Sequence, residues 1–234
     1  MKVLFVFAHP DDETFSSGGT IAKLKSLRHT VKLVTATRGE KGQVGEPPIT
    51  SREKLGEVRE RELRFAAKVL GISEIFFLDY IDGELEKVGV EKLEKDVLKI
   101  LRKENPDIVI TFDKRGGSNH PDHKVMSVAA TGAFNKFSEK AKKCVRLYHT
   151  AVPRSYIKKF EEAGFEYKAF GKVMGVPDDE ITTVVDISAA YKKKLEAFKC
   201  YQTQRLDWER ILKRVKVIDA KKEYFTLISE KEIA

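Results

Sequence analysis

The sequence contains few of the features that mark specialised classes of protein. It has 7 Pro and 15 Gly among 234 residues and no run of 18 apolar residues, which excludes collagen, low-complexity disorder and a membrane-spanning helix. Its two cysteines, Cys144 and Cys200, form no CxxC motif, so we expect buried small side chains rather than a disulfide or a zinc knot. Acidic residues follow the apolar start of the chain at once, without a small-residue cleavage site. This pattern predicts a strand rather than a signal peptide, and a cytoplasmic protein.

Charge of one sign is not concentrated either. The chain has 44 Lys and Arg against 36 Asp and Glu, a net charge of +8. The signs alternate, as in residues 52–64, so we interpret most of these side chains as solvated helix faces; Lys192–Lys194 is the one basic cluster of note. We therefore expect neither a nucleic acid nor a membrane as partner. The charged share of 34%, mainly Lys and Glu, is a compositional hint of a thermophile.

Short apolar runs alternate with helical patterns along most of the chain. This alternation predicts an α/β fold with a mainly parallel sheet and a site at the carboxyl ends of its strands. Thr50 and Glu53 predict a capping box for the helix that ends at Gly71. Residues 153–180 lack periodicity, and we expect an insertion over one face. No repeat or linker divides the chain, so we expect one domain, 1–234. The expected strands are 3–8, 31–36, 75–78, 108–112, 145–148, 183–187 and 224–228, and the expected helices include 50–70, 90–101 and 122–137, with further helices from 188 and around 208–215.

Polar side chains gather where the predicted strands end. His9, Asp11 and Asp12 follow the first strand, and His120 and His123 follow the fourth. The carboxyl ends of parallel strands share one edge, and residues three apart share one face of a helix. Two imidazoles and one carboxylate leave an open position on an ion, as in a catalytic zinc site, although the same set suits non-haem iron. These five residues are candidates for three ligands, and the two left over for the acid and base.

Each pattern also has a simpler interpretation when it is taken alone. Acidic residues after a strand can cap a helix through its dipole, and a lone HxxH is usually a pair of surface histidines. Both patterns at strand ends favour a site. Arg38 could bind substrate or pair with Glu40, and Asp82 could bind substrate or shape a turn. We expect His149 to be a hydrogen-bonded core histidine.

Three short motifs together resemble a known family. AHPDDE at 8–13, TRGE at 37–40 and HPDH at 120–123 are similar to the motifs of the LmbE-like, or PIG-L, family of zinc-dependent N-deacetylases. The resemblance covers 1–137, and KLEAFKCYQTQ at 194–204 is similar to the family's C-terminal helix. It implies a Rossmann-like three-layer sandwich that removes an acetyl group from an N-acetylated small molecule, above all an N-acetylglucosamine-containing sugar or glycoconjugate.

The resemblance also implies roles for the residues of the first motif and for the end of the second. His9, Asp12 and His123 would hold one zinc ion per chain, with another divalent ion as an alternative. Asp11 would be the general base that takes a proton from the attacking water. These roles are carried over by motif position and distinguish the two aspartates, which spacing alone does not.

Four further positions are carried over in the same way. His120 would stabilise the tetrahedral oxyanion or protonate the leaving amine, and Asp122 would orient an imidazole. Arg38 would contact the substrate. Some family members have a tyrosine two residues before the second motif; this chain has Ser118 there, so that help must come from elsewhere.

Two other functions remain as alternatives. An HxGH-type nucleotidyltransferase also has histidines after its first strand, but two acids follow His9 here and would repel a phosphate. A non-catalytic, basic Rossmann-like module would show a salt-sensitive interaction and would not need Asp11 or His123. A homo-oligomer is compatible with the sequence.

Overall fold

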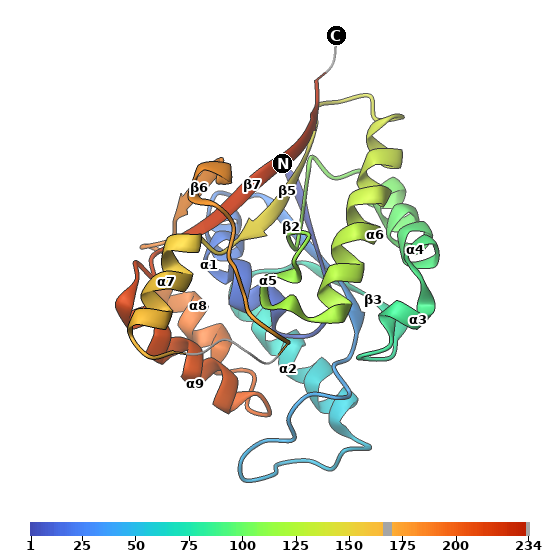
Figure 1. Cartoon of the computed structure of the whole chain (residues 1–234). Coiled ribbons are helices and arrows are strands. Elements are labelled where there is room, and N and C mark those ends of the chain that lie inside the picture. The colour runs from blue at the N-terminus through green and yellow to red at the C-terminus, as the bar shows by residue number, and fades with distance from the viewer. Residues whose placement is uncertain (166–169, 233–234) are drawn as a thin grey trace.

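The computed structural model describes residues 1–165 and 170–232. Its centre is a seven-stranded sheet in the order β3-β2-β1-β4-β5-β7-β6 (Figure 1). The first five strands are parallel, and β7 runs antiparallel to both β5 and β6. The α/β fold with a mainly parallel sheet is therefore confirmed. The strands are β1 Lys2–Phe7, β2 Thr30–Thr37, β3 Glu74–Tyr80, β4 Ile108–Thr111, β5 Val145–Ala151, β6 Thr183–Asp186 and β7 Lys222–Lys231.

Helices cover both faces of the sheet. On one face α1, α2 and α8 pack together, and on the other α4 packs on α6 (Figure 1). The helices are α1 Asp12–Ser26, α2 Leu55–Leu70, α3 Leu85–Val88, α4 Val90–Glu104, α5 Gly116–Asn119, α6 Pro121–Ser138, α7 Arg154–Glu162, α8 Tyr191–Phe198 and α9 Arg205–Arg214, with 3-10 turns η1 Asp178–Glu180 and η2 Val215–Val217.

The strand order changes direction between two neighbouring strands, β1 and β4. After β1 the chain continues to β2 and β3 on one side, whereas β4 and β5 lie on the other side of β1. The loops that leave β1 and β4 therefore diverge, and ligands of such sheets bind at this point. Every residue of Val3–Ala8 is buried, because a strand covered on both faces needs apolar side chains on both. This rigid strand positions the residues that follow it.

Two local expectations have different outcomes. Gly71 does end α2 in a left-handed conformation, with φ 86°. The capping box is wrong: α2 begins at Leu55, and the Thr50 hydroxyl donates to the carbonyl of Ser51 instead. The amide of Leu55 bonds to the carbonyl of Arg52, so a turn precedes the helix and moves its start beyond the predicted cap.

The part of the chain after β5 holds the elements that sequence periodicity did not resolve. Residues 153–165 include α7, and a bridge between Pro153 and Val176 closes the loop that follows it. Ile157, Phe160 and Val173 form a small apolar cluster of their own. The described part of the segment thus packs around α7. Residues 166–169 lie outside the described part, and the insertion over one face stays a prediction.

The C-terminal region is fastened into the middle of α1 by a buried ion pair. Glu223 accepts hydrogen bonds from the amides of Gly19 (3.0 Å) and Thr20 (2.7 Å). Lys194 lies 2.6 Å from Glu223 and donates to the carbonyl of Phe15 at 3.2 Å. The carboxylate therefore accepts hydrogen bonds from the helix, the ammonium group donates one to it, and each neutralises the other's charge.

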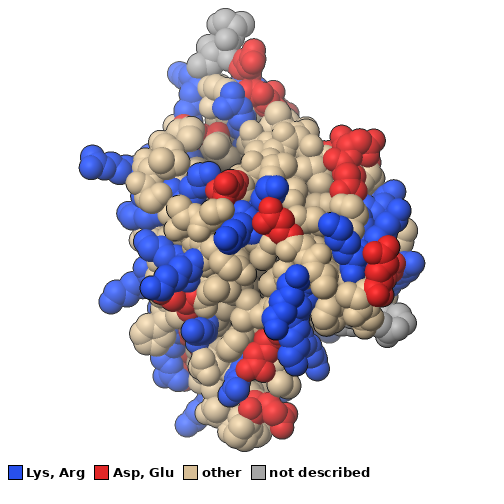
Figure 2. Space-filling view, turned by 90° about the vertical axis from the view of Figure 1, so that its left-hand side faces the viewer, with Lys and Arg blue, Asp and Glu red and all other residues tan. Residues whose placement is uncertain are grey.

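Charged groups of both signs are spread over the surface. On the face shown in Figure 2, Lys and Arg groups are separated by acidic and uncharged ones. This agrees with the interpretation of most basic residues as solvated side chains. Within the described residues, no helix is long and apolar enough to cross a membrane.

Candidate active site

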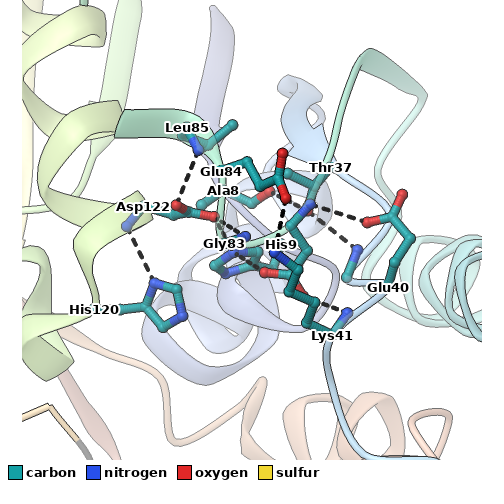
Figure 3. A network of polar contacts seen from close by, with 12 residues as sticks. Ala8, His9, Thr37, Glu40, Lys41, Gly83, Glu84, Leu85, His120 and Asp122 are labelled. Carbon is teal, nitrogen blue, oxygen red and sulfur yellow. Dashed lines mark hydrogen bonds and ion pairs between the residues drawn. The ribbon is translucent and has the colours of Figure 1, made fainter. Parts of the chain in front are cut away.

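Three loops bring the candidate residues together at the carboxyl edge of the sheet. The turn from β1 to α1 carries the first motif, the turn after β3 carries Asp82, and the start of α6 carries the second motif. Figure 3 shows part of this network, with His9 and the turn at Gly83 beside Asp122 at the start of α6. The sequence-predicted residues that meet here are His9, Asp11, Asp12, Asp82, His120, Asp122 and His123.

Three of these residues converge on one point. Nδ1 of His9 lies 3.0 Å from Nε2 of His123 and 3.7 Å from a carboxylate oxygen of Asp12. Nε2 of His123 lies 3.2 Å from the other oxygen of Asp12. Atoms that share a tetrahedral zinc ion at about 2.0–2.1 Å are about 3.3 Å apart. The spacing of these donors therefore fits one ion, and a nitrogen of His120 lies within 4.8 Å of those of His9 and His123.

Hydrogen bonds on the far side of each ring set which nitrogen is free. Nε2 of His9 faces Asp82 at 3.0 Å and Asp122 at 3.1 Å, so its proton belongs there and Nδ1 keeps its lone pair. Nδ1 of His123 donates to the carbonyl of Gly116 at 3.0 Å, which leaves the lone pair on Nε2. Both free lone pairs thus point to the same place, in the pattern of carboxylate-supported metal histidines.

The charges of the site are unbalanced without a cation. Burial disfavours a charged His9, but hydrogen bonds to Asp122 and Asp82, together with the charge of Asp12, raise the pKa of His9 to about 10. Without a cation the ring is therefore charged, and an ion would take the place of the proton on Nδ1. Burial likewise opposes ionisation of Asp12, yet His123 and then His9 lower the pKa of Asp12 to about 2. Several buried carboxylates are therefore ionised around few positive groups. A divalent ion would neutralise them, so the donor set fits such an ion.

Asp122 and Asp82 support His9 from behind. Asp122 accepts hydrogen bonds from the amides of Gly83 (2.6 Å) and Leu85 (3.2 Å), which fix it to the turn after β3 (Figure 3). Asp82 accepts from the amide of Lys41 at 2.9 Å through its second oxygen. The imidazole that Asp122 contacts is that of His9. Asp82, a candidate for substrate binding, has both oxygens engaged inside the protein.

Asp11 occupies a strained backbone position. Its φ is 97°, a left-handed value that only glycine adopts without cost, and its amide donates to Glu13 at 3.1 Å. Its carboxylate accepts a hydrogen bond from Nη2 of Arg59 at 2.8 Å. Burial raises the pKa of Asp11 well above its usual value, and Arg59 counteracts only part of this. The side chain is thus held in place and has a stronger affinity for a proton than a surface aspartate.

Sequence reasoning missed Arg59. It is buried in α2, and its guanidinium also donates to the carbonyls of Pro10 and Gly39. The signal was present, because Arg59 lies four residues after Leu55 and four before Leu63, on the apolar stripe of the helix. A charged residue in that stripe needs a buried partner, and Asp11 is that partner.

His120 lies at the open side of the cluster as a neutral imidazole. Its Nδ1 accepts a hydrogen bond from the amide of Asp122 at 3.2 Å, so the proton is on Nε2. Burial, followed by the charges of His9 and His123, lowers the pKa of His120 to about 4. Its ring meets that of Phe170 edge to face, with centroids 4.3 Å apart. At neutral pH it offers one N–H donor beside the cluster.

The structure does not bring Arg38 into this cluster. Its guanidinium contacts Glu60 and Asp79, each at 2.5 Å, and lies over the ring of Phe77. Glu40, the alternative partner considered from the sequence, is not one of these contacts.

His149 is a hydrogen-bonded core histidine, as expected. Its Nε2 lies 3.0 Å from the hydroxyl of Thr131, and burial lowers the pKa of His149 to about 4. Ser118 has its hydroxyl 3.4 Å from Nδ1 of His123, behind that ring. The chain thus has no phenol two residues before the second motif, and His120 offers an N–H donor beside the cluster.

The C-terminal motif supports the site without entering it. The hydroxyl of Tyr201 donates to Glu13 at 2.5 Å, and that of Thr203 donates to Glu62 at 2.5 Å. Burial raises the pKa of Glu13 to about 6, against the hydrogen bonds of Thr14 and Tyr201. Glu13 also accepts a hydrogen bond from the amide of Asp11. This network therefore connects the C-terminal motif to the first motif.

Together, the fold and this site define an α/β enzyme of the hydrolase class. The chain matches the family model "PIG-L: GlcNAc-PI de-N-acetylase" over residues 4–134. It is 30% identical to a 1D-myo-inositol 2-acetamido-2-deoxy-alpha-D-glucopyranoside deacetylase of Thermomonospora curvata, over 87% of this chain and 80% of that one. The chain therefore belongs to the PIG-L family of deacetylases.

Solved structures agree with this assignment. The N,N'-diacetylchitobiose deacetylase from Pyrococcus horikoshii is similar with a TM-score of 0.71 and 26% identity, over 97% of this chain and 83% of that one. A 4-carboxy-2-hydroxymuconate hydratase from Pseudomonas putida has a TM-score of 0.67 at 18% identity, over 100% of this chain and 98% of that one. The second likeness concerns the fold alone, because one fold can carry different reactions.

Proposed function

We propose that this chain is a zinc-dependent N-deacetylase acting on an N-acetylglucosamine-containing sugar or glycoconjugate. The observation that carries the proposal is the convergence of two imidazole lone pairs and the Asp12 carboxylate beside a buried Asp11. The substrates in the names of the relatives support the amino sugar: an inositol glycoside in one case and chitobiose in the other. We infer that the chain works as one domain; its cytoplasmic location stays a prediction from the sequence.

His9, Asp12 and His123 are the residues we assign to one zinc ion per chain. Their free donor atoms lie 3.0–3.7 Å from one another, and the hydrogen bonds behind both imidazoles hold them in that arrangement. When bound, the ion would act as a Lewis acid toward the amide and would lower the pKa of a water molecule. The carboxylates of Asp82 and Asp122 keep the His9 ring oriented toward it.

Asp11 is the residue we assign as general base. Arg59 holds one of its oxygens, so the other is the oxygen that takes the proton from the attacking water. The pKa of Asp11 is raised by burial, which strengthens it as a base near neutral pH. The strained backbone and the hydrogen bond to Glu13 keep the carboxylate from turning away.

His120 is the residue we assign to the developing oxyanion. Its Nδ1 is taken by the amide of Asp122, so Nε2–H is available to donate as negative charge forms on the carbonyl oxygen. A neutral donor suits this task better than delivery of a proton to the amine. The substrate contacts of Arg38 and Asp82 stay proposals, and both would require these side chains to change their present partners.

The test combines metal content with product release. Wild-type protein supplied with zinc should release acetate from at least one of N-acetylglucosamine, N,N'-diacetylchitobiose and N-acetylglucosaminyl-inositol. His123→Ala should lose both the ion, by elemental analysis, and the activity. His29→Ala is the matched control, because its ring lies at the surface near the N-terminus, 3.2 Å from the Met1 amino group. Equal zinc in the wild type and His123→Ala would remove His123 from the ligands, and no acetate from any substrate would overturn the proposed reaction.

A further inference from the structure

Three large apolar side chains are left half-exposed beside the active site. Phe170 is 47% exposed, Met174 51% and Val152 38%. Single exposed apolar residues are common and need no explanation, but a group of them at the edge of a site is typical of a ligand surface. The ring of Phe170 packs edge to face on His120, the donor we assign to the oxyanion. The group therefore continues the active site outward.

The backbone that carries these side chains is held along α5. The side-chain amide of Asn119 donates to the carbonyl of Lys172 at 2.8 Å, and Nη1 of Arg115 donates to that of Gly175 at 2.9 Å. In Figure 1 the chain before β6 runs past α5, in agreement with these contacts. Two side chains of the loop after β4 thus fix the segment that follows α7.

A second set of contacts ties the same segment to the end of β5. The amide of Val176 donates to the carbonyl of Val152 at 2.8 Å, and the amide of Arg154 donates to Val176. A narrow cleft separates the two loops and is lined by Gly117, Asn119, Val152 and Met174, among others. Met174 and Val152 line this cleft together with Asn119, the residue that precedes His120.

We propose that Phe170 and Met174 form an apolar subsite that binds the group attached to the amino sugar, and that the enzyme prefers substrates with an apolar aglycone, alkyl or aryl. This inference rests on the proposed function. The acetamido group must lie between buried Asp11 and half-buried His120. What extends beyond His120 toward solvent meets Phe170, whose face suits a ring or an alkyl chain and offers no hydrogen bond to a polar group.

The experiment compares N-acetylglucosamine with its phenyl glycoside as substrates. In the wild type, KM for the phenyl glycoside should be about 2- to 10-fold lower than for the free sugar, the range expected for one aromatic contact. Phe170→Ala should abolish that advantage and Phe170→Tyr should keep it. Phe65→Ala is the matched control, because Phe65 is 63% exposed on α2; its ratio of KM values should equal that of the wild type.

Calorimetry on the same proteins measures the binding of the deacetylated product, phenyl glucosaminide. This measurement separates the proposed subsite from the proposed reaction. Tighter binding to the wild type than to Phe170→Ala supports the subsite even if neither substrate releases acetate, in which case the proposed reaction alone fails. Equal binding to both proteins overturns the subsite. An equal rise of KM for both substrates in Phe170→Ala also overturns it, because Phe170 would then act only by holding His120.

Discussion

The two parts of the chain contribute to the site in different ways. The parallel part, from β1 to α6, supplies every residue that we assign to the ion, the base and the oxyanion. The part from β5 onward supplies no such residue among those described. It supplies contacts to those residues instead. Tyr201 donates a hydrogen bond to Glu13, and the ring of Phe170 packs on His120. Chemistry and its surroundings therefore come from separate stretches of sequence.

The difference also appears in the kind of interaction. In the parallel part, buried carboxylates and imidazoles face one another and shift one another's pKa. In the later part, the exposed side chains near the site are apolar and their backbone is held by single hydrogen bonds. Substitutions in the first part should affect turnover, and those in the second should affect stability or substrate choice. The predictions below test this division, in order of decreasing effect on turnover.

The largest loss should follow from Asp11→Asn. The amide can still accept a hydrogen bond from Arg59 but cannot take a proton, so kcat should fall by about 10²–10⁴-fold with zinc content unchanged. Elemental analysis and steady-state kinetics measure the two quantities. Asp219→Asn, an exposed change in the later part, is the control and should match the wild type. Loss of zinc in proportion to activity would make Asp11 a ligand and reverse the roles of the two aspartates.

A smaller loss should follow from His120→Ala, about 10²-fold in kcat, because one oxyanion donor is removed. His120→Gln should recover part of it, since its amide can still donate. The pKa of His120 is lowered to about 4, so the ring is neutral from about pH 5 upward and sets no alkaline limb. The alkaline limb of the kcat profile should therefore be the same in His120→Ala as in the wild type. A limb that disappears in the variant would show that His120 acts in its charged form.

Tyr201→Phe should test the support from the later part. It removes a 2.5 Å hydrogen bond to buried Glu13, which should lower the free energy of unfolding by about 1–3 kcal/mol. Because Glu13 holds the amide of Asp11, kcat should also fall, but only a few-fold. Denaturant unfolding and kinetics measure both. Tyr191→Phe is the control from the same region, and similar losses in the two variants would contradict a specific role for Tyr201.

His149→Gln should leave turnover unchanged and alter only the response of stability to acid. Burial lowers the pKa of His149 from 6.5 to about 4, so the folded state favours the neutral ring. The stability that depends on it is complete above pH 6.5 and is lost as the pH falls toward 4, by up to about 3 kcal/mol. The variant should lack this part of the slope when the free energy of unfolding is measured from pH 7 to 4. An unchanged slope would contradict the assignment.

Much of the fold could be predicted because its central strands, β1, β2 and β4, are largely buried on both faces. All seven expected strands are present, and the central ones were visible as short apolar runs. The residues after β1 and β4 could be placed together for a related reason: parallel strands share one carboxyl edge. The elements missed are those without a long apolar pattern. Helix α7 lies in a segment whose small cluster contains only three buried residues, too few to give a clear period.

The supporting contacts of Arg59 and Tyr201 could not be predicted, because their partners are distant in sequence. Arg59 meets Asp11 across 48 positions, and Tyr201 meets Glu13 across 188. Spacing within a motif contains no information on such pairs. Asp82 illustrates the same limit: its strand, β3, is not a neighbour of β1, and only the turn after it reaches His9. Arg59 inside the apolar stripe of α2 was the one sequence pattern that indicated a buried partner.

The hydrogen bonds of Glu13 show that the AHPDDE motif contains residues with two different roles, catalytic and structural. We assign Asp11 to the reaction, whereas Glu13 is fully buried and joins the amide of Asp11 to Tyr201. Selection for architecture and selection for catalysis can therefore separate in evolution. A homologue that keeps the counterparts of Glu13 and Tyr201 but has lost the counterpart of Asp11 would be a folded pseudoenzyme. In a search of genomes for deacetylases of this kind, the glutamate indicates the fold. The first aspartate of the motif is the residue that indicates activity.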